Sequence, residues 1–169
     1  MFGAKRICAA FDVAPDGQHA TLAVAALLPD GRVRVEIAAA WPSTDAARAE
    51  LSAMLDRIKP VALGWFPAGP AAALAPDLRA RPGLTDLSGG KASEACQGLA
   101  DLTRSLRIVH PADPLLDAHI KGASKLNSGD GWRFTRKSGH VDAAYAAAGA
   151  VKLAQELPPV RRARVRMIA

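Results

Sequence analysis

The segment GDGWRFTRKSGHVDAAYAAAGAVKLAQEL, residues 129–157, decides the fold that we expect for this chain. It joins a basic, aromatic loop to a helix built almost wholly of alanine, which begins near Asp142 and stops at Pro158. A carboxylate in the first turn of a helix lies at the positive end of the backbone dipole, which favours its ionised form. Asp142 is therefore a candidate ligand for a divalent cation. The alternative is an ordinary helix-start residue.

The chain ahead of this segment predicts consecutive strands followed by alternating helices and strands. Apolar runs and a clean alternation of apolar and charged residues predict strands at 6–13, 19–28 and 32–37, separated by turn sequences. Helical spacing and short apolar runs then predict helices at 44–59, 71–80, 92–104 and 114–125, and strands at 61–66, 84–88 and 106–109. This order predicts an α/β fold, with an antiparallel meander of three strands extended by parallel strands and covered by helices.

Composition is typical of a single domain spanning residues 1–169, which is large enough to bury a core without disulfides or structural metals. Half of the residues are apolar, but alanine supplies much of this share and only 5% are aromatic, so the packing must be close. Cys8 and Cys96 lack metal-ligand spacing and are expected to be small buried residues in a reducing compartment. No apolar run without charges is long enough to span a membrane, and no signal-peptide pattern is present.

The net charge of +6 and the isoelectric point of about 9.8 indicate a polyanionic partner, most simply nucleic acid. Part of the excess lies in a basic C-terminal tail, residues 158–169, and part between Lys121 and Lys137. The alternative is a GC-rich genome that uses arginine for solubility.

Asp12 ends the first strand, which we expect to be central in the sheet. A carboxylate inside an apolar strand is costly unless it is paired or binds a metal. If the last helix packs beside this strand, Asp12 and Asp142 meet, and a divalent cation between them removes their repulsion. Mg²⁺ or Mn²⁺ is the expected ion, because the ligands are oxygens and no thiolate or imidazole cluster is apparent. Such an ion activates water and stabilises a phosphoryl transition state. The alternative is two unrelated acids at element ends.

The other motifs in the sequence give weaker indications of function. The segment GLTDLSGGKAS at 83–93 fails as a phosphate-binding loop, because Thr85 replaces a required glycine and Ala92 replaces Ser or Thr. The four histidines are scattered along the sequence. His119 is expected on the surface of a helix, and His140 is the one closest to the candidate acids, although a solvated loop position is the simpler interpretation.

Five segments resemble the large terminase subunit of tailed phages of actinobacteria. They are FDVAPDG at 11–17, GPAAALAPDL at 69–78, EACQGLADL at 94–102, RIVHPADPLLDAHIKGA at 107–123 and, most specifically, GDGWRFTRKSGHVDAAYAAAGA at 129–150. The resemblance covers nearly the whole chain but only the C-terminal nuclease domain of that family, without its N-terminal packaging ATPase. It implies a ribonuclease H-like fold and a metal-dependent endonuclease that cuts concatemeric double-stranded DNA during genome packaging.

Residue by residue, Asp12 matches the first-strand acid of the family and Asp142 matches its last-helix acid. The family usually has a further acid at the end of the fourth strand, where this chain has Phe66. Three acids could replace that ligand, and the sequence does not select among them: Glu94, Asp130 and Asp16.

The resulting hypothesis is a hydrolase in the cytoplasm of a bacterial host, with Mg²⁺ or Mn²⁺ held by the catalytic residues Asp12 and Asp142. Its expected partners are double-stranded DNA, a packaging ATPase domain and a portal. Arg133, Arg136 and Lys137 are expected to contact DNA phosphates, whereas Trp132 and Phe134 are expected to pack into the core. Two alternatives stay open: a non-catalytic DNA-binding or motor-docking module of the same fold, and a resolvase-type nuclease for branched DNA.

Overall fold

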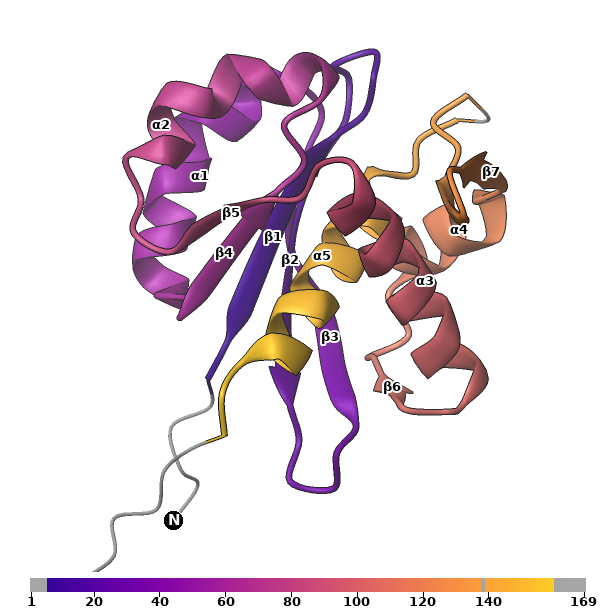
Figure 1. Cartoon of the computed structure of the whole chain (residues 1–169). Coiled ribbons are helices and arrows are strands. Elements are labelled where there is room, and N and C mark those ends of the chain that lie inside the picture. The colour runs from indigo at the N-terminus through magenta and orange to yellow at the C-terminus, as the bar shows by residue number, and fades with distance from the viewer. Residues whose placement is uncertain (1–5, 138, 160–169) are drawn as a thin grey trace, which may run out of the picture.

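A computed structural model describes residues 6–137 and 139–159 (Figure 1). The strands are β1 Cys8–Val13, β2 Ala20–Leu27, β3 Val33–Trp41, β4 Ala62–Trp65, β5 Leu84–Asp86, β6 Ile108–Val109, β7 Lys125–Ser128 and β8 Gly131–Phe134. The helices are α1 Thr44–Ile58, the 3₁₀ turn η1 Gly69–Leu74, α2 Ala75–Arg79, α3 Gly90–Arg104, α4 Pro114–Gly122 and α5 Asp142–Glu156.

Six strands form one mixed sheet in the order β5-β4-β1-β2-β3-β6. The first three strands of the chain pair antiparallel, and β4, β5 and β6 join them in parallel. The expected meander with parallel additions is therefore confirmed, and β1 lies in the interior of the sheet as expected.

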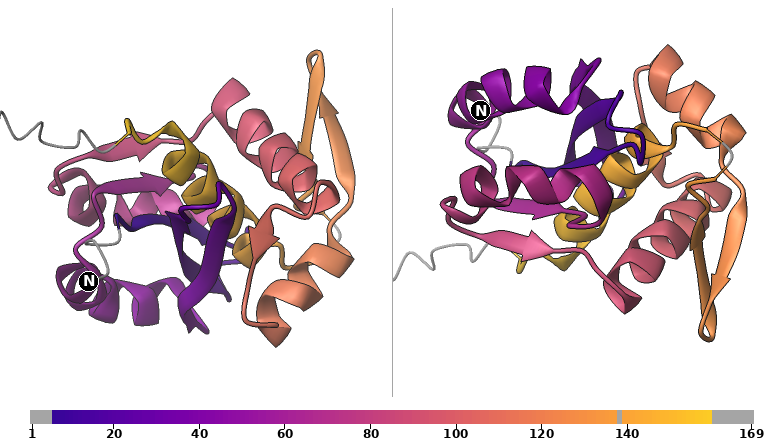
Figure 2. Two further views of the ribbon diagram at one scale, coloured as in Figure 1. Left: turned by 90° about the horizontal axis from the view of Figure 1, so that it is seen from below. Right: turned by 90° about the horizontal axis from the view of Figure 1, so that it is seen from above.

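Alternation along β1 divides the core into two layers. Cys8 and Ala10 contribute to the cluster that includes α3 and α5, whereas Ala9, Phe11 and Val13 contribute to the cluster that includes α1 and α2. Figures 1 and 2 show this arrangement, with α1 and α2 on one side of the sheet and α3, α4 and α5 on the other. Asp12 continues the series of Cys8 and Ala10, so its side chain belongs to the α5 face.

The alanine-rich helix α5 approaches the sheet closely because both surfaces carry small residues. A Cβ atom placed on Gly149 would lie 2.7 Å from Leu87 Cδ1, 2.9 Å from Ala10 Cβ and 3.1 Å from Phe66 Cε2. Of the residues that α5 buries, seven are alanine and one is glycine, and Tyr145 is the single aromatic one. The close packing expected from the composition is thus concentrated where α5 crosses β1 and β2.

The expectation of a loop ahead of Asp142 is wrong for Gly131–Phe134, which form strand β8 and pair with β7 in a second, two-stranded sheet. Gly129 and Asp130 form its two-residue turn, and Gly129 has the positive φ of 59° that such hairpin turns require. The helix expected at 114–125 ends earlier, at Gly122, because Lys125 already belongs to this hairpin.

The cysteines, the basic tail and the lengths of the helices were the other features expected from the sequence. Cys8 and Cys96 are free and buried, and burial raises the pKa of each thiol to about 11, which keeps both protonated at neutral pH. Of the basic tail, only Pro158 and Pro159 fall within the described residues. Among the helices of the described residues, none is both long and apolar enough to cross a membrane.

Replacing Gly149 by Ala is expected to destabilise the protein by about 1–3 kcal/mol, because the added methyl group overpacks the α5–β1 contact. Gly98→Ala in α3 is the matched control, since the nearest atom to its added Cβ is 4.0 Å away. This control is expected to be neutral or to stabilise the helix by up to about 1 kcal/mol. Chemical denaturation measures both values, and equal effects of the two substitutions would contradict the close approach.

Candidate functional site

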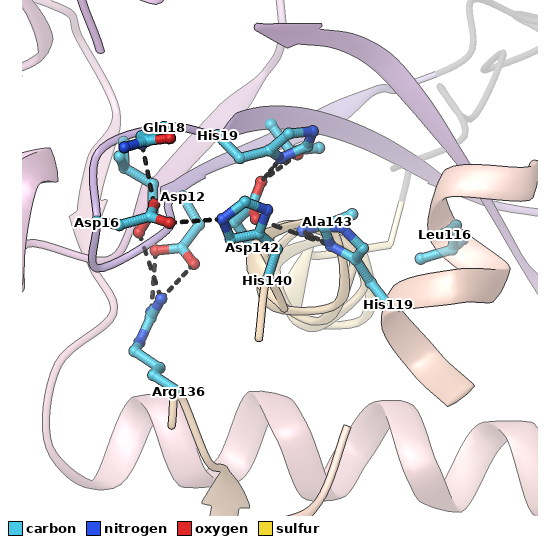
Figure 3. A network of polar contacts seen from close by, with 12 residues as sticks. Asp12, Asp16, Gln18, His19, Leu116, His119, Arg136, His140, Asp142 and Ala143 are labelled. Atoms are coloured by element: carbon cyan, nitrogen blue, oxygen red, sulfur yellow. Dashed lines mark hydrogen bonds and ion pairs between the residues drawn. The ribbon is translucent and has the colours of Figure 1, made fainter. Parts of the chain in front are cut away.

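Asp12 is completely buried at the end of β1 and is paired with Arg136 (Figure 3). Arg136 Nη1 donates to Oδ2 at 2.7 Å and Nη2 donates to Oδ1 at 2.9 Å, so both carboxylate oxygens are engaged. The guanidinium also lies 3.8 Å from the centre of the Tyr145 ring. Burial raises the pKa of Asp12 to about 7, and Arg136 opposes this rise. Arg136 is thus an internal counter-ion for Asp12.

Asp142 is the first residue of α5 and is also completely buried. Its Oδ2 accepts a hydrogen bond from Thr21 Oγ1 at 2.6 Å and lies 2.6 Å from His19 Nδ1. The carboxylate does not cap its own helix, whose N-cap is Val141. Asp142 thus lies at the start of its helix, as expected, but its carboxylate bonds to a residue outside that helix.

The two acids lie close together because of the β1–β2 register. Asp12 is directly opposite Thr21 in the antiparallel pair, so both side chains point to the α5 face of the sheet. Thr21 then donates to Asp142, and the charge of Asp142 contributes to the raised pKa of Asp12. The first strand and the last helix therefore lie side by side as expected. Thr21, opposite Asp12 and bonded to Asp142, was not among the candidate site residues.

Three histidines that are far apart in the sequence gather around Asp142: His19, His119 and His140. His119 is buried rather than on the surface as expected, and its Nδ1 accepts the backbone N–H of Ala143 at 3.0 Å. The ring of His19 lies 5.3 Å from that of His119 and stacks 5.4 Å from that of His140. The expectation that no imidazole cluster exists is wrong. Burial lowers the pKa of His119, which keeps this ring neutral and able to accept.

The donor atoms around Asp142 have a spacing that suits a metal ion. One ligand atom each from His19, His119 and Asp142 lies within 4.8 Å of the others. Among the buried polar side-chain atoms of residues 6–137 and 139–159, Asp142 Oδ1 is without a hydrogen-bond partner. Asp12 differs, because Arg136 already uses both of its oxygens.

Phe66 stands where the sequence resemblance leads us to expect a third acid. The backbone N–H of Phe66 bonds to the carbonyl of Phe11 at 3.3 Å, next to Asp12, and the Phe66 ring packs edge-on against Tyr145 at 5.0 Å. Of the three proposed substitutes, Glu94 pairs with Lys152 in the C-terminal half of α5, and Asp130 lies at the tip of the β7–β8 hairpin. Asp16 is the nearest to the site, because its Oδ2 lies 2.7 Å from His140 Nε2.

The basic residues expected to bind DNA line two hollows that share Arg136. Arg133 and Arg136 line a hollow of about 230 Å³ with Phe66 and Tyr145. Arg136 and Lys137 line a second hollow of about 390 Å³ with Asp16 and other residues. Phe134 is buried and Trp132 packs against the same core cluster, as expected. Arg136, however, is committed to Asp12, which leaves Arg133 and Lys137 as the candidates for phosphate contacts.

Replacing Arg136 by Met is expected to lower the free energy of unfolding by about 3–5 kcal/mol near pH 8, because the Asp12 carboxylate is left buried without a partner. The loss is expected to shrink near about pH 5, where Asp12 binds a proton in the folded state. The direction of this pH dependence follows from the pKa of Asp12, which is higher in the folded state than the unfolded value of about 4. The contribution of Asp12 to stability therefore falls as the pH rises between these two pKa values.

Urea unfolding of the wild type and of Arg136→Met at both pH values measures this difference. In the background of Asp12→Asn the effect of Arg136→Met should lose its dependence on pH over this range. A loss that is equal or greater at low pH would contradict a buried carboxylate as the partner of Arg136.

The comparisons with known proteins address the fold. No family model matches the chain, and no curated protein matches its sequence. The structure is similar to the large terminase of bacteriophage HK97, with a TM-score of 0.68 and 14% identity over 89% of this chain. This chain spans 40% of the length of the HK97 protein.

Two nuclease structures are covered more fully. The large terminase nuclease of thermophilic phage G20c with bound magnesium has a TM-score of 0.64 at 18% identity, covering 89% of this chain and 82% of that one. The nuclease domain of the Thermus phage P74-26 large terminase has a TM-score of 0.60 at 16% identity, covering 86% and 78%. The resemblance found in the sequence is confirmed at the level of the fold: the chain has the ribonuclease H-like fold of phage large terminase nuclease domains.

Proposed function

We propose that this domain is a metal-dependent DNA endonuclease that belongs to a phage large terminase and cuts concatemeric double-stranded DNA during genome packaging. The observation that carries the proposal is the meeting of two completely buried carboxylates, Asp12 at the end of β1 and Asp142 at the start of α5. Buried acids are retained where they are paired or bind a cation. One oxygen of Asp142 has no hydrogen-bond partner in the part of the chain that the structure describes.

The surroundings of these acids support a phosphodiester substrate. Arg133 and Lys137 line hollows on either side of Arg136, and cations so placed attract and position a DNA backbone without reading its sequence. A divalent cation bound at the acids supplies an activated water and stabilises the charge that develops on the phosphate. A packaging ATPase domain and a portal are the proposed partners, in the cytoplasm of a bacterial host.

Two observations favour a second function, a DNA-binding or motor-docking module that does not cut. Arg136 neutralises Asp12 through both oxygens, and Phe66 stands where the family usually has an acid. In such a module the basic hairpin β7–β8 still binds DNA, but no ion is held between Asp12 and Asp142. Metal-dependent cutting separates the two functions.

Plasmid cutting with Mn²⁺, Mg²⁺ or EDTA is the direct test. The wild type is expected to cut with a divalent ion and not with EDTA, and Asp142→Asn is expected to lower the rate by at least about 100-fold, as loss of a catalytic metal ligand should. Asp12→Asn is also expected to lower the rate, because it removes the buried carboxylate that holds Arg136 beside the site. Asp101→Asn, an exposed acid on α3, is the control and should cut like the wild type.

Undiminished cutting by Asp142→Asn would refute the proposed site. No cutting by any protein, combined with a gel shift of duplex DNA at low salt, would support the non-cutting module. Faster cutting of a four-way junction than of linear duplex would instead support the resolvase-type alternative.

Arg133→Gln and Lys137→Gln are each expected to weaken DNA binding for all sequences alike and to reduce the slope of log K against log salt by about 1. Fluorescence anisotropy with a short duplex over a salt series measures this slope. Arg57→Gln on α1, across the sheet, is the control and should leave it unchanged. An unchanged slope for both Arg133→Gln and Lys137→Gln would place the DNA on another surface.

A further inference from the structure

The site around Asp142 is assembled from three separate parts of the chain. His19 directly precedes β2, His119 belongs to α4, and Asp142 begins α5. Figure 3 shows the two imidazole rings on either side of the carboxylate. His19 Nδ1 lies 2.6 Å from Asp142 Oδ2, and His119 Nδ1 lies 3.8 Å from Asp142 Oδ1. The two rings therefore lie next to different oxygens of the same buried carboxylate.

The two carboxylate oxygens of Asp142 differ in their hydrogen bonds. Oδ2 interacts with both Thr21 and His19, whereas Oδ1 is buried and lacks a hydrogen-bond partner among the described residues. An unsatisfied oxygen of a buried carboxylate is costly, so its retention needs an explanation. A cation beside Oδ1 provides one.

The distance between Oδ1 and His119 Nδ1 is suited to a shared ion. Two ligand atoms about 2.1 Å from a tetrahedral ion lie roughly 3.4 Å apart, so 3.8 Å requires only a small inward movement. The lone pair of His119 Nδ1 now accepts the N–H of Ala143, and an ion at that atom would have to replace this hydrogen bond. Thr21 would continue to hold the other oxygen and so fix the orientation of the carboxylate.

We propose that His19, His119 and Asp142 form the primary metal site of this domain, and that the site selects transition-metal ions such as Mn²⁺, Co²⁺ and Zn²⁺ over Mg²⁺. Two imidazole nitrogens and one carboxylate oxygen suit these ions, whereas Mg²⁺ prefers oxygen ligands and gives up its water reluctantly. Asp12 is not a ligand of this ion, because Arg136 holds both of its oxygens. The inference rests on the proposed nuclease function for the role of the ion, but its test measures binding alone.

Co²⁺ titration of the metal-free full chain, followed by visible absorption, tests the site without DNA. The wild type is expected to bind a single Co²⁺, which Zn²⁺ displaces at far lower concentration than Mg²⁺ does. His19→Gln and Asp142→Asn are expected to weaken Co²⁺ binding by more than about tenfold. Even the loss of a residue that only hydrogen-bonds to a metal ligand weakens metal binding by about tenfold or more. His119→Asn serves as a third variant if its circular dichroism matches the wild type, because His119 also accepts the N–H of Ala143.

His110→Gln is the matched control, since this histidine lies beside Asp117 and away from Asp142. It should bind Co²⁺ like the wild type. Asp12→Asn distinguishes the two possible ligand sets: retained binding supports the imidazole site, and binding lost in Asp12→Asn but kept in His19→Gln overturns it in favour of a carboxylate pair.

The inference and the proposed function can fail separately. Absence of Co²⁺ and Zn²⁺ binding, together with plasmid cutting in Mg²⁺, would overturn the imidazole site and leave the nuclease intact. Binding that depends on His19 without any DNA cutting would support the site and refute the nuclease.

Discussion

The close approach of α5 to β1 and β2 is the constraint on which the rest of this structure depends. Alanine and glycine on the helix face allow a separation that larger side chains would prevent, and Gly149 marks the tightest point. This approach sets the first residue of α5 beside the end of β1, so that Asp142 reaches Thr21 and His19. The contact of α5 with the sheet therefore does two things: along the helix it packs the core, and at the N-terminal end it positions the residues of the candidate site.

The electrostatics of the site follow from burial. Two acids that are both inaccessible to solvent need compensation, and the fold supplies it unequally. Asp12 receives a guanidinium through two hydrogen bonds. Asp142 receives a hydroxyl and an imidazole on one oxygen, and no hydrogen bond from residues 6–137 or 139–159 on the other. This asymmetry is the basis for assigning the proposed ion to Asp142, and it also explains why Arg136, expected beforehand to bind phosphate, is a poor candidate for that role.

Local patterns in the sequence predicted the elements well. The alternation in β3, the helical spacing in α1 and the order of strands and helices each depend on neighbours within a few residues, and they gave the correct sheet. The Gly129–Asp130 turn between two extended runs carried a hairpin signal that was overlooked, because the aromatic and basic residues around it were interpreted as a loop. The histidine cluster could not be predicted from the sequence, because His19, His119 and His140 come together only through tertiary packing. The partner of Arg136 lies 124 residues away, and no spacing rule reaches that far.

Arg136 has a consequence for how this domain meets an ion. In a site built from carboxylates alone, the apo protein must hold like charges together, and ion binding becomes part of folding. Here one of the two acids already has a cation supplied by the chain itself, and that cation lies against the face of Tyr145 where solvent screening is weak. The fold can therefore form before any metal is acquired, and chelators should strip an ion from this domain without unfolding it.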